Sequence, residues 1–249
     1  MQRAVEAFGL EGRTLYLPQM PYGGSYLLAA AIRSIGVDAW TTTDSDARTL
    51  ELGGKMTSGD ECYPQKVCMG DFLRMIEDEG RDKVGFLMPT ANGPCRFGQY
   101  LSLIRTKLDE LGYDDVPVIT ITSNDGYSSI GEYSQSLVRT AWRGVICQDI
   151  LMKALLKTRP YETEKGATDA AYHESLVDVG EALSTRGVSD RQRMARTRAA
   201  LTRSRERFGR VPVRYDRTRP LIGVVGEIFC RRSEGRRGGK ECRSRWSPD

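Results

Sequence analysis

The sequence predicts an α/β fold, with a mainly parallel, Rossmann-like sheet layer followed by a helical subdomain and the first strand of a truncated second α/β unit. In the first half, short apolar runs alternate with segments of helical periodicity that stop at glycines, a pattern typical of strands joined by helices. From about residue 130 to 208 the helical period continues without a strand. We therefore expect an α/β domain over residues 10–126, a helical subdomain over 127–219 and the start of a second unit over 220–231.

The strands of the α/β domain are expected where apolar and β-branched residues cluster in short runs. These runs lie at residues 14–18, 39–43, 84–88 and 116–121. Between the first two runs, an apolar segment from Ser25 to Ile35 predicts a helix that stops at Gly36.

Two further helices are expected to begin just after cysteine segments. Pro64 suits the first turn of a helix that ends near Gly80. After the turn at residues 93–98, Tyr100, Leu101, Ile104, Leu108 and Leu111 follow helical spacing up to Gly112. Functional loops of such a fold gather at the carboxyl ends of the parallel strands, so the cysteine loops are candidates for a site.

The helical subdomain is predicted from three periodic segments. The first covers residues 130–156, with one stripe made of Ile130, Tyr133, Leu137, Ala141, Val145 and Ile150, and the others cover 168–183 and 189–208. Seven arginines make the last helix basic (191, 193, 196, 198, 203, 205 and 207). We interpret them as a solvated face with acidic neighbours, and expect no nucleic-acid partner.

Residues 220–229 form an apolar run that enters a glycine turn, which is typical of the first strand of an α/β unit. A single strand without its sheet cannot bury both faces, so we expect the biological protein to continue beyond this chain. Residues 232–249 resemble a translated sequencing adaptor and hold six Lys or Arg against three Asp or Glu. The rest of the chain therefore carries a net charge of +1, compared with +4 for the whole, which gives no electrostatic reason to bind DNA or RNA.

No uncharged apolar run approaches the roughly 20 residues that span a bilayer, and the N-terminal segment is charged where a signal peptide is apolar. We expect a cytoplasmic protein with no membrane partner. The six cysteines stand at irregular, mostly long spacings, which does not indicate a disulfide framework.

Cys62 and Cys95 are the candidate metal ligands. Each lies in a turn just before an expected helix, where unpaired N–H groups and the helix dipole stabilise an anionic ligand or cofactor such as an iron–sulfur cluster. Their alternative roles are a local turn residue for Cys62 and a tight cap for Cys95. Two thiols in equivalent strand–loop–helix positions favour ligation over either role taken alone.

The other cysteines are weaker candidates. Cys68 forms a C-x5-C pattern with Cys62 that could bind the same metal group. It also lies on one helical stripe with Phe72, Met75 and Ile76, which favours a position in the core. Cys147 lies among apolar residues of a long helix and is expected to be structural, whereas Cys230 is a minor candidate. A single histidine excludes a histidine metal site, and the sequence has no phosphate-loop or dinucleotide fingerprint.

Three segments, SGDECYPQKVCMGDFL, MPTANGPCRFGQY and VVGEIF, resemble proteins related to the activases of 2-hydroxyacyl-CoA dehydratases, also called CoA-substrate-specific enzyme activases. The resemblance is closest to their region of unknown function between the activase and dehydratase-like portions, and covers about residues 10–230. It implies an oxygen-sensitive iron–sulfur protein, with a cluster of the [4Fe-4S] type, that receives low-potential electrons from an ATP-driven activase. In the dehydratases such an electron reduces a CoA thioester to a ketyl radical.

The resemblance implies cluster ligation by Cys62 and Cys95, with Arg96 and Gln99 neutralising or hydrogen-bonding the cluster. Two thiolates do not fill the four ligand positions of a cubane, so Cys68, Cys230, a missing segment or a non-protein ligand must complete the set. The implied partners are the activase, a dehydratase-like portion and an acyl-CoA substrate.

Two alternatives stay open at this point. The chain could be an iron-free scaffold that docks the activase to the dehydratase-like subunits, with its cysteines merely packed. It could also be a thiol-based redox enzyme, although it contains no C-x-x-C pair.

Overall fold

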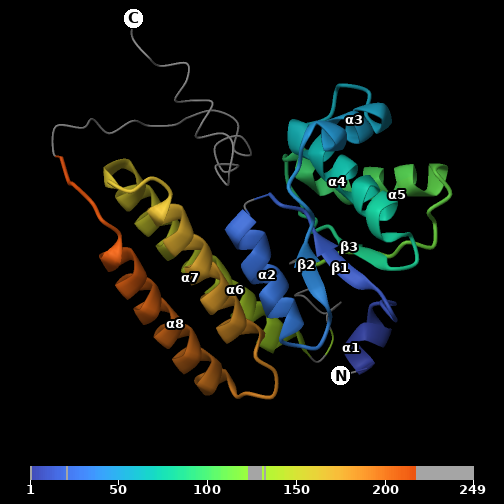
Figure 1. Cartoon of the computed structure of the whole chain (residues 1–249). Helices are drawn as coiled ribbons and strands as arrows, with labels where there is room; N and C mark the ends of the chain where they lie inside the picture. The colour runs from blue at the N-terminus through green and yellow to red at the C-terminus, as the bar shows by residue number, and fades with distance from the viewer. Residues whose placement is uncertain (1, 21, 123–130, 132, 217–249) are drawn as a thin grey trace, which may run out of the picture.

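The computed structural model describes residues 2–20, 22–122, 131 and 133–216, and shows one parallel sheet with helices on both faces (Figure 1). The sheet contains β1 (Thr14–Leu17), β2 (Ala39–Thr41), β3 (Val84–Leu87) and β4 (Val118–Ile119) in the order β2-β1-β3-β4. Every neighbouring pair is parallel. The predicted α/β class with a Rossmann-like layer is therefore confirmed, although β4 is shorter than the apolar run at residues 116–121.

The helices follow the predicted segments closely, with two additions, α1 and α3. They are α1 (Gln2–Ala7), α2 (Tyr22–Arg33), α3 (Ala47–Met56), α4 (Tyr63–Glu79), α5 (Tyr100–Glu110), α6 (Ser134–Thr158), α7 (Ala167–Ser184) and α8 (Asp190–Arg210), with 3-10 turns η1 (Arg96–Gln99) and η3 (Arg159–Tyr161). Gly80 ends α4 at φ 96°, as its position predicts. The α2 helix begins at Tyr22, earlier than the predicted Ser25.

Helix α3 was not predicted, because its segment carries two glycines and few apolar residues. Asp46 caps it by accepting hydrogen bonds from the N–H groups of Arg48 and Thr49, at 2.9 and 3.1 Å. Gly53 faces α4 closely: a Cβ atom there would lie 2.0 Å from the carbonyl oxygen of Lys66. The glycine that weakens the helical pattern is thus what lets the two helices touch.

Two apolar cores lie on opposite faces of the sheet. On one face α4 and α5 pack against β3, and the rings of Phe72 and Phe86 stack with centroids 4.1 Å apart. On the other face, Leu15 and Leu17 of β1 pack with Leu137 of α6. The alternation along β1 follows from its strand period, since successive side chains point to opposite faces.

A third core joins α2 to the helical layer of α6, α7 and α8, which lies to the left in Figure 1. The predicted stripe of α6 is wrong in part, because Val145 and Ile150 are exposed, and Ile130 lies outside the described residues. The buried stripe is Leu137, Thr140, Gly144, Cys147, Gln148, Leu151, Leu155 and Thr158. At Gly144 the missing side chain allows close packing on α2: a Cβ there would lie 3.2 Å from the Cβ of Leu27.

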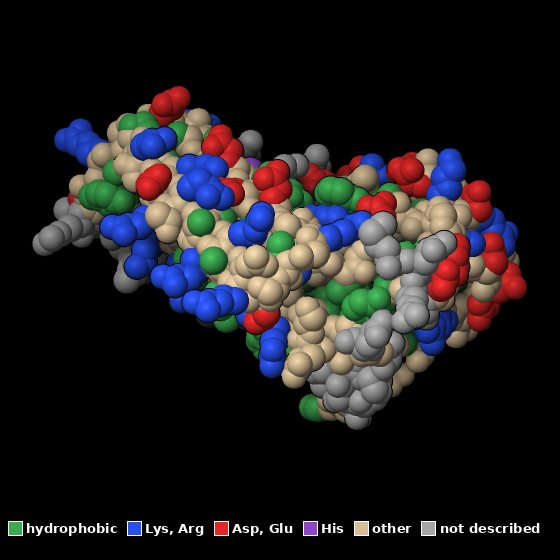
Figure 2. All heavy atoms as spheres, turned by 90° about the horizontal axis from the view of Figure 1, so that it is seen from below, with side chains coloured by type: hydrophobic (Ala, Val, Ile, Leu, Met, Phe, Trp, Pro, Cys, Tyr) green, Lys and Arg blue, Asp and Glu red, His purple; other side chains and the backbone are tan. Residues whose placement is uncertain are grey.

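The arginines of α8 are mostly exposed, and Lys and Arg side chains gather over the helical layer in Figure 2. Arg203 and Arg207 form ion pairs with Asp178 of α7. Arg193 departs from the predicted solvated face: it is buried and donates hydrogen bonds to the carbonyl oxygens of Leu183 and Thr185, which caps the end of α7. The predicted second unit at 220–231 and the tail at 232–249 lie outside the described residues.

Candidate metal centre

Cys62 occupies the N-cap position of α4, as its sequence context predicts. Pro64 lies in the first turn, and the N–H of Gln65 donates to the carbonyl oxygen of Cys62 at 2.9 Å. The thiol itself makes no capping hydrogen bond. It is half-buried and packs against the core under α4 and α5, so its sulfur lies beside a helix N-terminus and next to an apolar wall.

Cys95 occupies the N-cap position of η1, which runs directly into α5. The side chain is exposed and makes no capping hydrogen bond. The loop around it is tightly folded: a Cβ on Gly98 would lie 2.4 Å from the carbonyl oxygen of Ala91, and the Thr90 hydroxyl donates to the Gly98 carbonyl at 3.1 Å. Both predicted ligands therefore lie at helix starts. Cys62 precedes β3 in the chain, and Cys95 follows it.

The two cysteine loops meet at Tyr100, the first residue of α5. The buried Tyr100 side chain belongs to the core under α4 and α5, and Cys62 and Phe97 of the Cys95 loop pack against this core. Burial first, and then the negative charges of Cys62, Cys68 and Cys95 as thiolates, raise the pKa of Tyr100 above its ordinary value. All three predicted thiols thus contribute to the electrostatic surroundings of one phenol.

Arg96 ties the loops together from the outside. Its guanidinium donates to the carbonyl oxygen of Asp60, two residues before Cys62. Arg96 and Gln99 are both exposed, and Gln99 makes no capping hydrogen bond at the start of α5. Arg96 thus has a structural contact beside the thiols, whereas nothing in its surroundings gives Gln99 a defined role.

Cys68 is the least suited of the three predicted ligands. It lies in the core on the inner face of α4, 1% exposed. Burial, and then the charge of Asp71, raise the pKa of its thiol, so the sulfur keeps its proton. A metal ligand must be a thiolate, and binding there would have to offset that cost.

The thiols of Cys62 and Cys95 are of the right kind to supply two of the four ligands of a cubane iron–sulfur cluster. Among the described residues no group of three or more His, Cys, Asp and Glu side chains lies close enough to share a metal ion. Two thiols at separate helix N-termini suit the anionic sulfur-rich surface of a cluster, and a cubane takes four such ligands. Cys230, the remaining sequence candidate, lies outside the described residues.

Sequence reasoning placed Tyr100 on a helical stripe but missed that it lies beside both cysteine loops. A buried tyrosine needs a partner for its hydroxyl, and Tyr100 directly follows the Cys95 loop. Those two facts are the signal that could have assigned it to the site.

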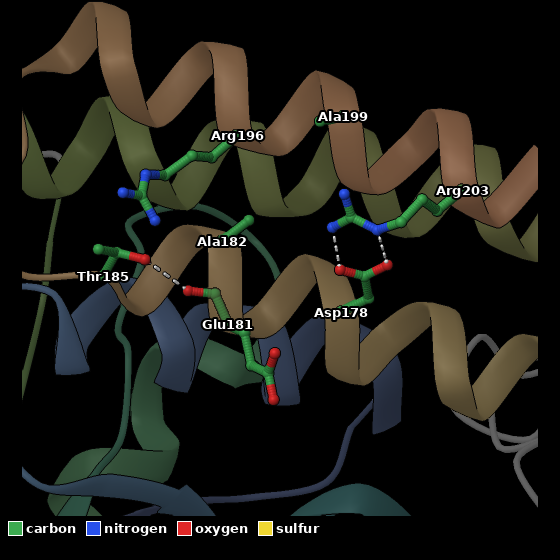
Figure 3. A pocket seen from close by; sticks show the side chains of 7 residues that line it. All are labelled: Asp178, Glu181, Ala182, Thr185, Arg196, Ala199 and Arg203. Carbon is green, nitrogen blue, oxygen red and sulfur yellow. Dashed lines mark hydrogen bonds and ion pairs between the residues drawn. The ribbon is translucent and has the colours of Figure 1, made fainter.

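A separate depression of about 380 Å³ lies on the helical layer between α7 and α8 (Figure 3). Its charged lining residues are Asp178, Glu181, Arg196 and Arg203, and Asp178 accepts a hydrogen bond from Nε of Arg203 at 2.8 Å. The formal charges of these four side chains cancel. None of the predicted site residues lines this depression, so it is no part of the thiol site.

Comparisons of the chain with protein-family models, with curated proteins and with solved structures found no match. In the part of the chain that the structure describes, no helix combines the length and apolar character needed to cross a membrane.

Proposed function

We propose that this chain is the iron–sulfur module of a 2-hydroxyacyl-CoA dehydratase and activase type of system. The observation that carries the proposal is that Cys62 and Cys95 each occupy the N-cap position of a helical segment, in two loops that the Arg96 guanidinium joins through the carbonyl oxygen of Asp60. Thiols drawn from two loops at one edge of a parallel sheet are suited to holding one cofactor between them.

The surroundings of the thiols favour an anionic cofactor. Each sulfur lies beside the N-terminus of a helical segment, where N–H groups and the dipole stabilise negative charge. The Tyr100 hydroxyl and the Arg96 guanidinium are the nearby groups that can hydrogen-bond or neutralise it. Such groups set the reduction potential of a cluster, together with its exposure to solvent.

A bound [4Fe-4S] cluster supplies one-electron chemistry at low potential. In the system that the sequence resembles, the electron comes from an ATP-driven activase and reduces a CoA thioester. We therefore propose the activase and a dehydratase-like portion as partners, and an acyl-CoA as the substrate class. An iron position that no cysteine occupies would be available to that substrate.

The proposal predicts that iron loading protects the two thiols. The full chain is incubated anaerobically with ferrous iron and sulfide, desalted and alkylated with iodoacetamide, and each cysteine peptide is measured by mass spectrometry. We expect Cys62 and Cys95 to react in the iron-free chain and to be protected at least about tenfold after loading, because a ligated sulfur is not a free nucleophile.

Cys147 is the internal control, since burial raises the pKa of its thiol to about 11 and keeps it unreactive in both states. Equal alkylation of Cys62 and Cys95 with and without iron would contradict ligation and leave the iron-free docking scaffold as the function.

A further inference from the structure

Helix α6 exposes a row of large apolar side chains on the side away from its neighbours in the fold. We call this row the α6 outer face; it consists of Trp142, Val145, Ile146, Ile150 and Leu156, which are between 45% and 59% exposed. Their spacing of three, one, four and six residues keeps them on one side of the helix. Isolated exposed apolar residues are ordinary, but a contiguous row marks an interaction surface.

The α6 outer face is not needed to hold the monomer together. The opposite face of α6, through Cys147, Leu151 and Leu155, packs into the core shared with α2 and α7. That core is closed by fully buried side chains such as Leu176 and Val179. The outer row leaves about half of its apolar surface in solvent, which costs solubility unless something covers it.

The charges within the row indicate the occupant. Asp149 and Lys153 lie one helical turn apart in the middle of the α6 outer face, both exposed. No ion pair of either residue occurs in the part of the chain that the structure describes. When two copies of α6 lie antiparallel about a two-fold axis at the level of Leu151, position 149 of one copy is opposite position 153 of the other.

We propose that a second copy of this chain covers the α6 outer face in an antiparallel, two-fold symmetric helix pair. The same register places Ile146 opposite Leu156 of the partner copy, so each ion pair has an apolar layer beside it. A two-fold interface uses the same surface twice, which is why one acidic and one basic residue suffice for two ion pairs.

The size of the α6 outer face sets the expected affinity of the dimer. From Trp142 to Leu156 the row extends roughly 20 Å along the helix, at about 1.5 Å per residue. A single helix pair of that length is at the small end of protein interfaces. We therefore expect a concentration-dependent dimer and not an obligate one. This inference does not depend on the proposed iron–sulfur function.

The test is sedimentation velocity of the full chain over a wide range of concentrations, with circular dichroism to verify folding. Ile146→Glu should raise the dimer dissociation constant at least about tenfold, because it places a charge in the apolar layer. Asp149→Lys and Lys153→Asp should each do the same through repulsion between like charges. Val177→Glu is the matched control, because Val177 of α7 is similarly exposed but does not belong to the α6 outer face. This substitution should leave the dimer dissociation constant unchanged.

Mixing the two charge variants distinguishes a second copy from any other occupant. A heterodimer of Asp149→Lys with Lys153→Asp has opposite charges at both contacts, so the mixture should dimerise at least about tenfold more tightly than either variant alone. A chain that stays monomeric throughout the concentration range would overturn the proposal. So would a mixture that associates no better than its components.

Discussion

Tyr100 is the residue through which the candidate site is organised. Cys62 and Cys95 come from different loops. Tyr100, in the first turn of α5, directly follows the Cys95 loop and belongs to the core against which Cys62 packs. Its ring also packs edge-on against Phe97, with centroids 5.3 Å apart, which fixes its orientation. A buried, well-packed ring gives both loops a fixed surface to pack against.

Asp71 gives a residue-scale prediction about stability. It is buried on α4, where Ser45 donates a hydrogen bond to Oδ2 at 3.0 Å and Oδ1 has no hydrogen-bond partner. Burial raises the pKa of Asp71 to about 7, although the Ser45 hydrogen bond and the charge of Arg74 act in the opposite direction. Between the unfolded and folded pKa values the unfolded state binds fewer protons, so the contribution of Asp71 to stability falls as pH rises through this window.

Asp71→Asn removes this titration. The unfolding free energy of the variant relative to the natural chain should rise by up to about 1.4 kcal/mol per pH unit from about pH 4 to about pH 7, and level off above. Urea denaturation at a series of pH values measures this difference. Asp46 and Arg74 are present in both proteins, so their titration cancels, and parallel stability curves would contradict the account.

At the scale of elements, the crossing of α3 and α4 holds the Cys62 loop between two helices. The contact is reciprocal, since a Cβ on Gly70 would lie 1.9 Å from the carbonyl oxygen of Thr49, and one on Gly53 would lie 2.0 Å from that of Lys66. Both obstacles are backbone atoms, which cannot rotate away as a flexible side chain can. The two helices can approach this closely because both positions are glycine.

Gly53→Ala should therefore lower the unfolding free energy by about 1–3 kcal/mol, because the helices must separate to admit the methyl group. Gly54→Ala is the matched control one residue further along α3, where nothing lies within 4 Å of an added Cβ. It should leave stability unchanged or raise it by up to about 1 kcal/mol through helix propensity. Thermal and urea unfolding measure both, and equal effects of the two substitutions would contradict the reciprocal contact.

The elements also show what local patterns predict and where they fail. Strands β1 and β3 and the start of α4 follow from apolar runs and from Pro64, because these signals act within a few residues. Helix α3 was missed because its Gly53 serves a contact with another helix. The stripe of α6 was misplaced because Thr140 and Gly144 are buried, Gly144 against Leu27 of α2 and Leu183 of α7. In both helices the outcome depends on packing between segments that are distant in the sequence, and a local sequence pattern carries no information about such packing.

The same distinction holds for the site. The N-cap positions of Cys62 and Cys95 were predictable from their neighbours, as was the core position of Cys68. How their loops come together beside Tyr100 was not, since it depends on the packing of the loop between α3 and α4 against the loop after β3.

At the scale of the whole molecule, the sheet separates two surfaces. The thiols lie in the α3, α4 and α5 half, whereas the α6 outer face and the arginines of α8 belong to the helical layer on the other side (Figure 1). A cofactor site and a dimer surface can therefore coexist without overlap.

The claim that Cys62 and Cys95 jointly hold a cluster is tested most directly by electron paramagnetic resonance. The full chain is loaded anaerobically with iron and sulfide, reduced with dithionite, and compared with Cys62→Ser, Cys95→Ser and the control Cys147→Ser. The account predicts the spectrum of a reduced iron–sulfur cluster in the natural chain and the control, and its loss in both single variants. A signal that persists unchanged when Cys62 and Cys95 are both replaced, or no signal in the natural chain, would contradict it.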